Sequence, residues 1–238
     1  MGEQNNKAKR YFNVYELFLL IVSHILICLA FFISPLVGAE SSILSTITSL
    51  IGVWGIIVIS KGDYFAHYIY IVFSILYSIL SISVGYYGEA IIYTFVMLPI
   101  HIYSVFVWKK NVANPVEKAV KIKTISKTHI IVSVIVAIIL LVPFYYLLLF
   151  LNTVNLIFST LSLTTSILAA YYMMQRVKFF PTLFAIDDFL LVLLWGIQIL
   201  IGNYQYIPTL IVCSCSFIND LYSAFCWFKR SIAKKRED

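Results

Sequence analysis

The sequence predicts an all-α integral membrane protein with eight transmembrane helices, and three observations support this class. Of the 238 residues, 61% are hydrophobic and only 12% are charged, which is about half the charged share of a soluble domain. Apolar runs of about 20 residues, the length of a membrane-spanning helix, recur along the chain. The basic residues lie in groups between alternate runs. With a mean hydropathy of +0.94, this pattern excludes both a soluble globule and a disordered chain.

The apolar runs place eight spans along the chain. At a rise of about 1.5 Å per residue, each helix reaches across a hydrocarbon core of about 30 Å. A β-barrel would instead show segments of about ten residues with alternating polarity. The predicted spans are residues 14–36, 43–60, 64–84, 90–107, 130–151, 154–174, 183–201 and 206–226.

The first span also has features of a cleavable signal peptide. A basic start precedes an apolar stretch that ends at Val37-Gly38-Ala39, and small residues at this point are typical of a cleavage site. The apolar stretch is longer than the usual signal core of about 7–15 residues. We therefore expect a retained helix.

Positive charge predicts the orientation of the chain. All 17 Lys and Arg residues lie before the first span or after the second, fourth, sixth and eighth. The opposite loops carry only Glu40 and Glu89. The positive-inside rule then places both termini in the cytoplasm. The net charge of +6 is explained by topology and by anionic lipid headgroups, so no nucleic-acid partner is expected. The groups are Lys7, Lys9 and Arg10; Lys61; the six lysines from Lys109 to Lys127; Arg176 and Lys178; and five basic residues from Lys229 to Arg236.

An internal repeat organises the chain. The stretch Ile102–Trp108 recurs as Leu221–Trp227 at an offset of 119, with Tyr, Ser, Phe and Trp at the same spacing. Ser45-Thr46 recurs as Ser159-Thr160 at an offset of 114. Interfacial aromatic belts explain the two tryptophans themselves, but not the shared spacing around them. Paired repeats around a central site are a transporter design.

The predicted architecture is therefore 1 + (3 + 1 + 3), with two parallel three-helix repeats. The single helix between the repeats restores the orientation of the second. The predicted units are an N-terminal segment with an additional helix, the first repeat, a basic loop with a linker helix, the second repeat and a basic tail. They cover residues 1–42, 43–108, 109–152, 153–228 and 229–238.

Ionisable residues within the spans mark a candidate site, because each costs a few kcal/mol in the hydrocarbon. Asp220 and His101 each lie seven residues before a repeated tryptophan, so the repeat places them at symmetry-related points. They either bind a ligand or pair with each other or with a hydroxyl to hold helices together.

Further polar residues occur in the last two spans. Asn219 lies next to Asp220 but about 100° around the helix. Asp187 and Asp188 lie near the start of the seventh span, where a helix-start charge is the plainer interpretation. Gln198 is three turns beyond Asp187 on the same face, and its amide suits a heterocycle or a ribose.

Two tryptophans, Trp54 and Trp195, lie within spans, where each either stacks on a planar ligand or packs against helices or lipid. No Gly-rich phosphate loop, metal-ligand spacing or nucleophile with a nearby base is present, and the four histidines stand alone. We therefore expect no enzyme activity, no metal and no cofactor. The cysteines are interpreted as reduced small hydrophobic residues.

The chain resembles the PnuC family of bacterial vitamin-precursor transporters over spans two to eight. The first half carries Ser60-Lys61-Gly62, Gly85–Glu89, Pro99 and Trp108 in the order and spacing of the family. The second half carries Asp187 followed by Gln198, and Asn219–Tyr222 followed by Trp227.

This resemblance implies a fold related to the SWEET sugar transporters, a homotrimer in the bacterial plasma membrane, and facilitated diffusion with trapping by a separate cytoplasmic kinase. The family's best-known substrate is nicotinamide riboside, while sister groups carry riboflavin, thiamine or deoxynucleosides. Gln198, Asn219 and Asp220 match family positions. Tyr93 and His101 stand where the family commonly has Asn and Gln, and no tryptophan lies around Thr209–Val212.

The sequence thus predicts a carrier that binds a nucleoside-like vitamin precursor and works by alternating access. A substrate-binding membrane subunit that does not itself transport is the alternative. The predicted binding residues are Gln198, Asn219, Asp220, His101, Tyr93, Asp187, Trp195 and Trp54.

Overall fold

A computed structural model describes residues 11–37, 42–113 and 119–237, with side chains up to residue 232. Within these residues, eight helical segments are long and apolar enough to cross a membrane, and no named strand occurs. The predicted all-α class and the eight spans are therefore confirmed. The basic residues of the N-terminal segment, part of the proposed cleavage site and two loop residues lie outside the described residues; they are Lys7, Lys9, Arg10, Gly38, Ala39, Glu40 and Lys118.

The helix boundaries follow the predicted runs, with three corrections. The fourth span begins at Tyr87 and ends at Lys110, the seventh begins at Phe180, and the last helix continues to Glu237. The helices are α1 (Val14–Ile33), α2 (Ile43–Ser60), α3 (Phe65–Val84), α4 (Tyr87–Ile91), α5 (Leu98–Lys110), α6 (Lys127–Phe150), α7 (Leu156–Met174), α8 (Phe180–Leu200) and α9 (Ile207–Glu237). A π-helical segment, η2 (Ile92–Met97), joins α4 to α5 within the fourth span.

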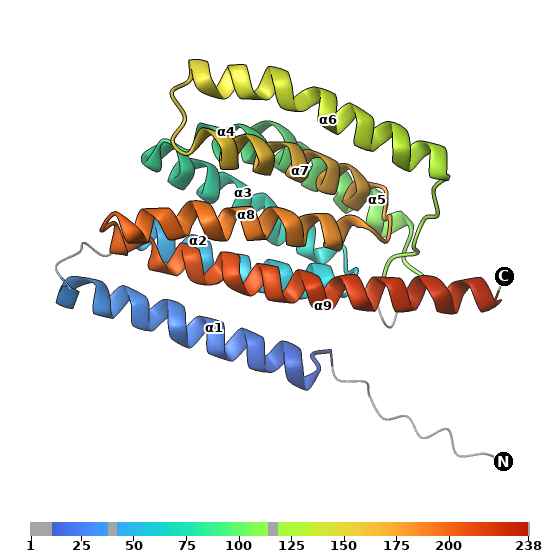
Figure 1. Ribbon diagram of the computed structural model, residues 1–238. Helices are drawn as coiled ribbons and strands as arrows, with labels where there is room; N and C mark the ends of the chain where they lie inside the picture. The colour runs from blue at the N-terminus through green and yellow to red at the C-terminus, as the bar shows by residue number, and fades with distance from the viewer. Residues whose placement is uncertain (1–10, 38–41, 114–118, 238) are drawn as a thin grey trace, which may run out of the picture.

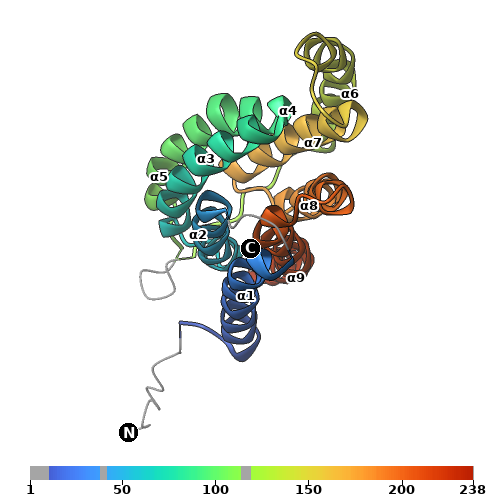
Figure 2. The ribbon, with the colours of Figure 1, turned by 90° about the vertical axis from the view of Figure 1, so that its left-hand side faces the viewer.

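The helices form an elongated bundle with α1 and α6 at opposite edges (Figure 1, Figure 2). Between them, α2 packs against α3 and α3 against α5, while α7 packs against α8 and α8 against α9; contacts of α2 with α9 and of α5 with α7 join the two sets. Helix α6 packs against α7 and buries only Leu148 of its own residues, so much of its apolar surface faces outward. The polar interior therefore lies between α2–α5 on one side and α7–α9 on the other.

The connections that carry basic residues meet at one end of the bundle. The Tyr11 hydroxyl donates to Asp63 at 2.8 Å, and Lys61 forms an ion pair with Glu16. The guanidinium of Arg230 donates to the backbone carbonyl of Lys61 at 3.2 Å. Helix α1 begins and α9 ends at this same end (Figure 1). This arrangement agrees with the alternating basic loops, while the membrane face on which they lie stays a prediction.

Backbone turns at equivalent positions support the predicted repeat. Gly62 follows α2 with φ of 77°, and Arg176 follows α7 with φ of 62°, at the offset of 114 that also relates Ser45 to Ser159. Gly85 ends α3 with φ of 78°, and Gly202 follows α8 with φ of 96°. Left-handed residues are unusual outside glycine, so their recurrence at matching helix ends indicates two similar paths.

The two repeated tryptophans are buried inside the protein and do not form the interfacial belt that the sequence indicated. Trp108 and Trp227 are both fully buried, and their ring centroids lie 6.0 Å apart. The Trp108 indole donates to the Met173 carbonyl at the end of α7 at 3.2 Å, and the Trp227 indole donates to the Ser60 carbonyl at the end of α2 at 3.0 Å. Each segment thus caps a helix end of the other.

The loop before α6 joins the two equivalent turns. The amide of Val120 donates to the Gly62 carbonyl at 3.0 Å, and the amide of Lys123 donates to the Arg176 carbonyl at 3.1 Å. Four residues of loop therefore link the two halves at the basic end.

Candidate functional site

A buried cavity lies between the two halves of the bundle. Its volume is about 50 Å³, which is room for ordered water but less than the cavity of about 150 Å³ that accepts benzene in an engineered protein. Residues of α2, α3, η2, α5, α7, α8 and α9 line it. The polar lining residues are Tyr70, Tyr77, Tyr93, His101, Asp187, Asp188, Ser216 and Asp220.

Three carboxyl groups form one side of the cavity. Asp187 and Asp188 lie on α8, and Asp220 lies on α9. Helix α8 begins at Phe180, two turns earlier, so the interpretation of Asp187 and Asp188 as helix-start charges is wrong. These three side chains are between 1% and 8% exposed. Buried carboxylates need a proton, a cation or several hydrogen-bond donors, and the three groups meet this need differently.

Asp187 is held by hydroxyl groups of α7. Ser162 donates to its Oδ1 at 2.7 Å, and Ser166 donates to Oδ2. Thr165 adds a longer contact of 3.3 Å to Oδ1. With donors on both oxygens, this arrangement suits an ionised carboxylate.

Asp188 on α8 and Asp220 on α9 line the same cavity. Among the described residues, no amide, hydroxyl or imidazole donates to Oδ2 of Asp188, although the side chain is only 8% exposed. Unlike Asp187, Asp188 is therefore not compensated by donors on both oxygens.

Histidine and tyrosine side chains form the opposite side. The ring of Tyr70 stacks on His101 with centroids 4.9 Å apart and planes inclined by 6°. His101 in turn contacts His67 through their Nδ1 atoms, 2.9 Å apart. The histidines were expected to stand alone, but the fold brings α3 and α5 together and pairs two of them. One of the rings therefore carries its proton on Nδ1.

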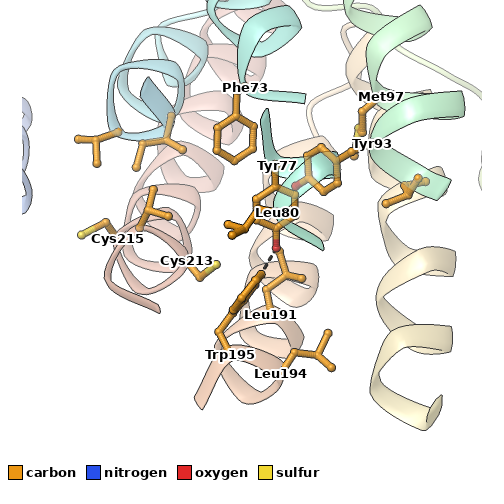
Figure 3. Close-up of a cluster of buried hydrophobic side chains, with 14 of the residues drawn as sticks. Phe73, Tyr77, Leu80, Tyr93, Met97, Leu191, Leu194, Trp195, Cys213 and Cys215 are labelled. Carbon is orange, nitrogen blue, oxygen red and sulfur yellow. Dashed lines mark hydrogen bonds between the residues drawn. The ribbon is translucent and has the colours of Figure 1, made fainter. Parts of the chain in front are cut away.

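Aromatic rings also close the end of the cavity away from the basic loops. Figure 3 shows Tyr77 between Tyr93 and Trp195, and the Trp195 indole donates to the Tyr77 hydroxyl at 2.7 Å. The Tyr77 and Tyr93 ring centroids are 4.4 Å apart. Tyr93 lies in the π-helical segment, and such segments are frequent at functional sites.

The structure brings together four of the predicted binding residues, His101, Tyr93, Asp187 and Asp220, around the cavity. Trp195 lies behind Tyr77 as a buried second layer. Trp54 is 41% exposed and faces α1, where its ring is 5.9 Å from that of His24. It is therefore placed away from the cavity.

The two predicted amide side chains are used in packing between helices. Gln198 donates to the Tyr86 hydroxyl at 3.0 Å and accepts from Asn203 at 2.7 Å. Asn219 donates to the Ile56 carbonyl on α2 at 2.8 Å. Neither lines the cavity, so a direct role for them requires a different conformation.

The residues that the sequence analysis missed follow one face of α3. His67, Tyr70 and Tyr77 are spaced by three and seven residues, so they share a helix face. A polar aromatic stripe in an otherwise apolar span was the signal that could have identified them. Among the described residues that line the cavity, none is Lys or Arg, and the described part of the chain holds no cluster suited to a metal ion.

An eight-span helical bundle around a buried polar cavity is the architecture of a membrane transporter. The model of the nicotinamide mononucleotide transporter family matches residues 42–229. The chain therefore belongs to this family, and the predicted resemblance to PnuC is confirmed. A solved structure described as the vitamin B3 transporter PnuC has the same fold, with a TM-score of 0.79 at 18% identity over 92% of each chain. Among curated protein sequences, none is similar enough to count as a match.

Proposed function

We propose that this chain carries a cationic, nucleoside-like vitamin precursor, with nicotinamide riboside as the leading substrate, down its gradient by alternating access. The observation that supports the substrate class is the cavity itself. Three carboxyl groups line it, and none of its described lining residues is Lys or Arg.

This charge distribution distinguishes between the candidate substrates that the family resemblance left open, because they differ in charge. The positively charged ring of nicotinamide riboside or thiamine is attracted by a carboxylate in a low-dielectric site. Riboflavin and deoxynucleosides are neutral and gain no such attraction. A phosphate group on nicotinamide mononucleotide would meet like charge and find no guanidinium or ammonium group to bind it.

The aromatic lining supports the same class. Tyr70, Tyr77 and Tyr93 offer ring faces, and a cationic ring over an aromatic face is stabilised by about 0.5–2 kcal/mol. Phe73 packs between them, with its centroid 5.3 Å from that of Tyr77. These rings take the place of the tryptophan pair that is missing around Thr209–Val212.

The small cavity supports alternating access. A volume of about 50 Å³ does not hold a nucleoside, so substrate entry requires the two halves to separate. Their matching turns and exchanged tryptophan contacts provide two similar units that can rotate against each other, as in repeat-based transporters.

The remaining parts of this proposal come from the family resemblance. We expect a homotrimer in the plasma membrane with cytoplasmic termini, and a separate kinase that traps the substrate by phosphorylation. The outward-facing apolar surface of α6 is available for lipid or for a neighbouring copy.

Uptake by proteoliposomes that contain the purified chain tests the proposal. Labelled nicotinamide riboside should enter without ATP or sodium, whereas its neutral reduced form, nicotinamide mononucleotide and riboflavin should enter at least tenfold more slowly. Binding without uptake would instead indicate the non-transporting subunit. Equal uptake of the charged and neutral forms would contradict the cation-selective cavity.

A carboxylate variant connects the selectivity to the site. Asp187→Asn should lower the affinity for nicotinamide riboside about tenfold, or about 1.4 kcal/mol, with little effect on any neutral ligand. Asp63→Asn is the matched control, because Asp63 lies at the basic end and outside the cavity lining. An equal loss in both variants would argue for a general effect on folding.

A further inference from the structure

We infer that the groove between α6 and α7 is a binding site for an anionic phospholipid of the leaflet at the basic end of the bundle. The groove has a volume of about 350 Å³, and α6 packs against α7 at the edge of the bundle (Figure 2). It shares no lining residue with the central cavity. The inference therefore does not depend on the proposed substrate.

Apolar side chains form both walls of the groove. Val132, Val136 and Leu140 line it on α6, and Ile167 and Leu168 line it on α7. The three positions on α6 are four residues apart, so they share one helix face. Val132 and Val136 remain exposed within the bundle. This face therefore has room for an apolar chain beside α7.

The hydroxyl groups within the groove already have partners in the protein. Ser133 donates to the Ile130 carbonyl at 2.9 Å, and its oxygen lies 2.5 Å from the Tyr172 hydroxyl. Thr164 donates to the Thr160 carbonyl at 2.9 Å. Burying a polar group is costly only where it lacks a hydrogen bond. An acyl chain in the groove therefore covers these hydroxyl groups without that cost.

The length of the groove matches one leaflet of a bilayer. On α6 it runs from His129, near the start of the helix, to Leu140. At a rise of about 1.5 Å per residue, this distance is about 16 Å, which is about half of a hydrocarbon core of about 30 Å. A helix of a second copy would pack along the whole span. The groove instead has the depth of a lipid tail that enters from the basic end.

Polar and basic side chains lie at the basic end of the groove. The Tyr171 hydroxyl and Nε2 of His129 are 2.8 Å apart, and both residues line the groove. Gln175 lies one turn beyond Tyr171 on the same face of the chain, and the ammonium group of Lys123 donates to its Oε1 at 2.8 Å. Lys123 is exposed. An ammonium group is therefore placed where the phosphate of a lipid in the groove would lie.

The same two helices form a second groove at their other end, which has no such charge. Tyr145 and Tyr146 of α6 line it together with Ile157 and Leu161 of α7, and its volume is about 360 Å³. None of the described residues that line it is Lys, Arg or His. Basic residues near the membrane surface attract anionic lipids. Charge therefore distinguishes two grooves of similar size and selects an anionic lipid at the basic end alone.

Thermal unfolding of the intact protein in detergent is the first test. Phosphatidylglycerol should raise the midpoint by several degrees, because it binds the folded chain. Phosphatidylcholine should need about fivefold more lipid for the same shift. Glycerol phosphate, which has the phosphate but no tail, should give no shift. Equal shifts with the two lipids, a shift with glycerol phosphate, or no shift with phosphatidylglycerol would overturn the inference.

A pair of lysine variants assigns the headgroup to the groove. Lys123→Gln keeps a donor for Gln175 but removes the charge, and should weaken phosphatidylglycerol binding about fivefold. Lys127→Gln is the matched control, because Lys127 is also exposed but lies about 200° around α6 from His129. Its binding should match that of the wild type. An equal loss in both variants, or no loss in Lys123→Gln, would overturn the assignment.

A pair of valine variants assigns the tail to the groove. Val136→Trp fills the groove with an indole, whereas Val134→Trp places the same ring on an exposed position about 200° around the helix. Native mass spectrometry should show phosphatidylglycerol retained by the wild type and by Val134→Trp, and lost from Val136→Trp. Retention by Val136→Trp would overturn the inference. A smaller oligomeric mass in Val136→Trp alone would place a second copy in the groove and also overturn it.

Discussion

The segment from α2 to α5 and the segment from α7 to α9 follow similar paths but bring different chemistry to the cavity. Both have a left-handed turn after the first helix and another after the second, and both end in a buried tryptophan that caps the other segment. At the position seven residues before that tryptophan, however, the first segment has His101 and the second has Asp220. The two segments take similar turns, while the carboxyl groups that line the cavity all lie on the second segment.

This difference teaches that symmetry and selectivity have separate physical origins here. Similar backbones allow two equivalent arrangements of the halves, which alternating access requires. Unequal side chains give the cavity an acidic wall and an aromatic wall, which the proposed flat cationic substrate requires.

The largest effect is expected at Gly52 on α2, which packs against Phe73 of α3 and Val212 of α9. A β-carbon on Gly52 would lie 2.8 Å from Cε2 of Phe73 and 3.0 Å from Cγ2 of Val212. Gly52→Ala should push the Phe73 ring into the cavity and lower uptake about tenfold, because overpacking costs about 1–3 kcal/mol. Gly196→Ala is the control, since nothing lies within 4 Å of its added carbon. Normal uptake by Gly52→Ala would show that Phe73 and Val212 move aside freely for the added carbon.

A smaller effect should distinguish equivalent hydroxyl groups of α2 and α7. Ser162 donates to Asp187, whereas Thr48, 114 residues earlier, donates to the Leu44 carbonyl of its own helix. Ser162→Ala should weaken binding of nicotinamide riboside about fivefold, or about 1 kcal/mol, because Asp187 loses a donor that suits its ionised form. Binding to Thr48→Val should be unchanged in the same assay. Similar losses in both would remove the distinction between the segments.

The repeat itself is tested by the paired tryptophans. Trp108→Phe and Trp227→Phe each remove one indole hydrogen bond to a helix-end carbonyl and should each lower the stability by about 1 kcal/mol. Thermal unfolding in detergent should therefore give similar shifts for the two variants. A large shift in one alone would mean that the two contacts are not equivalent.

The smallest effect is expected outside both segments. Glu16→Gln removes the charge that pairs with Lys61 but keeps an acceptor for the Asn13 amide. The pair is mostly buried, with Lys61 17% and Glu16 5% exposed, but the substitution keeps an acceptor for Lys61 and α1 lies outside both segments, so uptake should change by less than about twofold. A larger loss of uptake would give α1 a direct part in the movement of the halves.

The sequence predicts the features that depend on composition and on distance along the chain. Span number follows from the length of apolar runs, and the buried acids stand out because each is costly in a membrane. Asp220 and His101 were found in this way, Asp187 as a carboxylate near the start of a span, and Tyr93 only through the comparison with the family.

Features that depend on contacts between helices could not be read from the sequence. The direction of Asn219 is decided by the close approach of α2, which offers the Ile56 carbonyl. Gln198 is occupied by Tyr86, a residue between two helices. The pairing of His67 with His101 joins residues 34 positions apart, and no local pattern marks it.

The π-helical segment Ile92–Met97 also has a consequence for length. A π turn holds more residues than an α turn, so the fourth span contains surplus chain at the level of Tyr93. Each residue of a regular helix turns the chain by about 100°. Removing one residue from this segment would therefore rotate Tyr93 by about 100° relative to α5. The extra residue keeps Tyr93 and His101 of α5 directed at the same cavity.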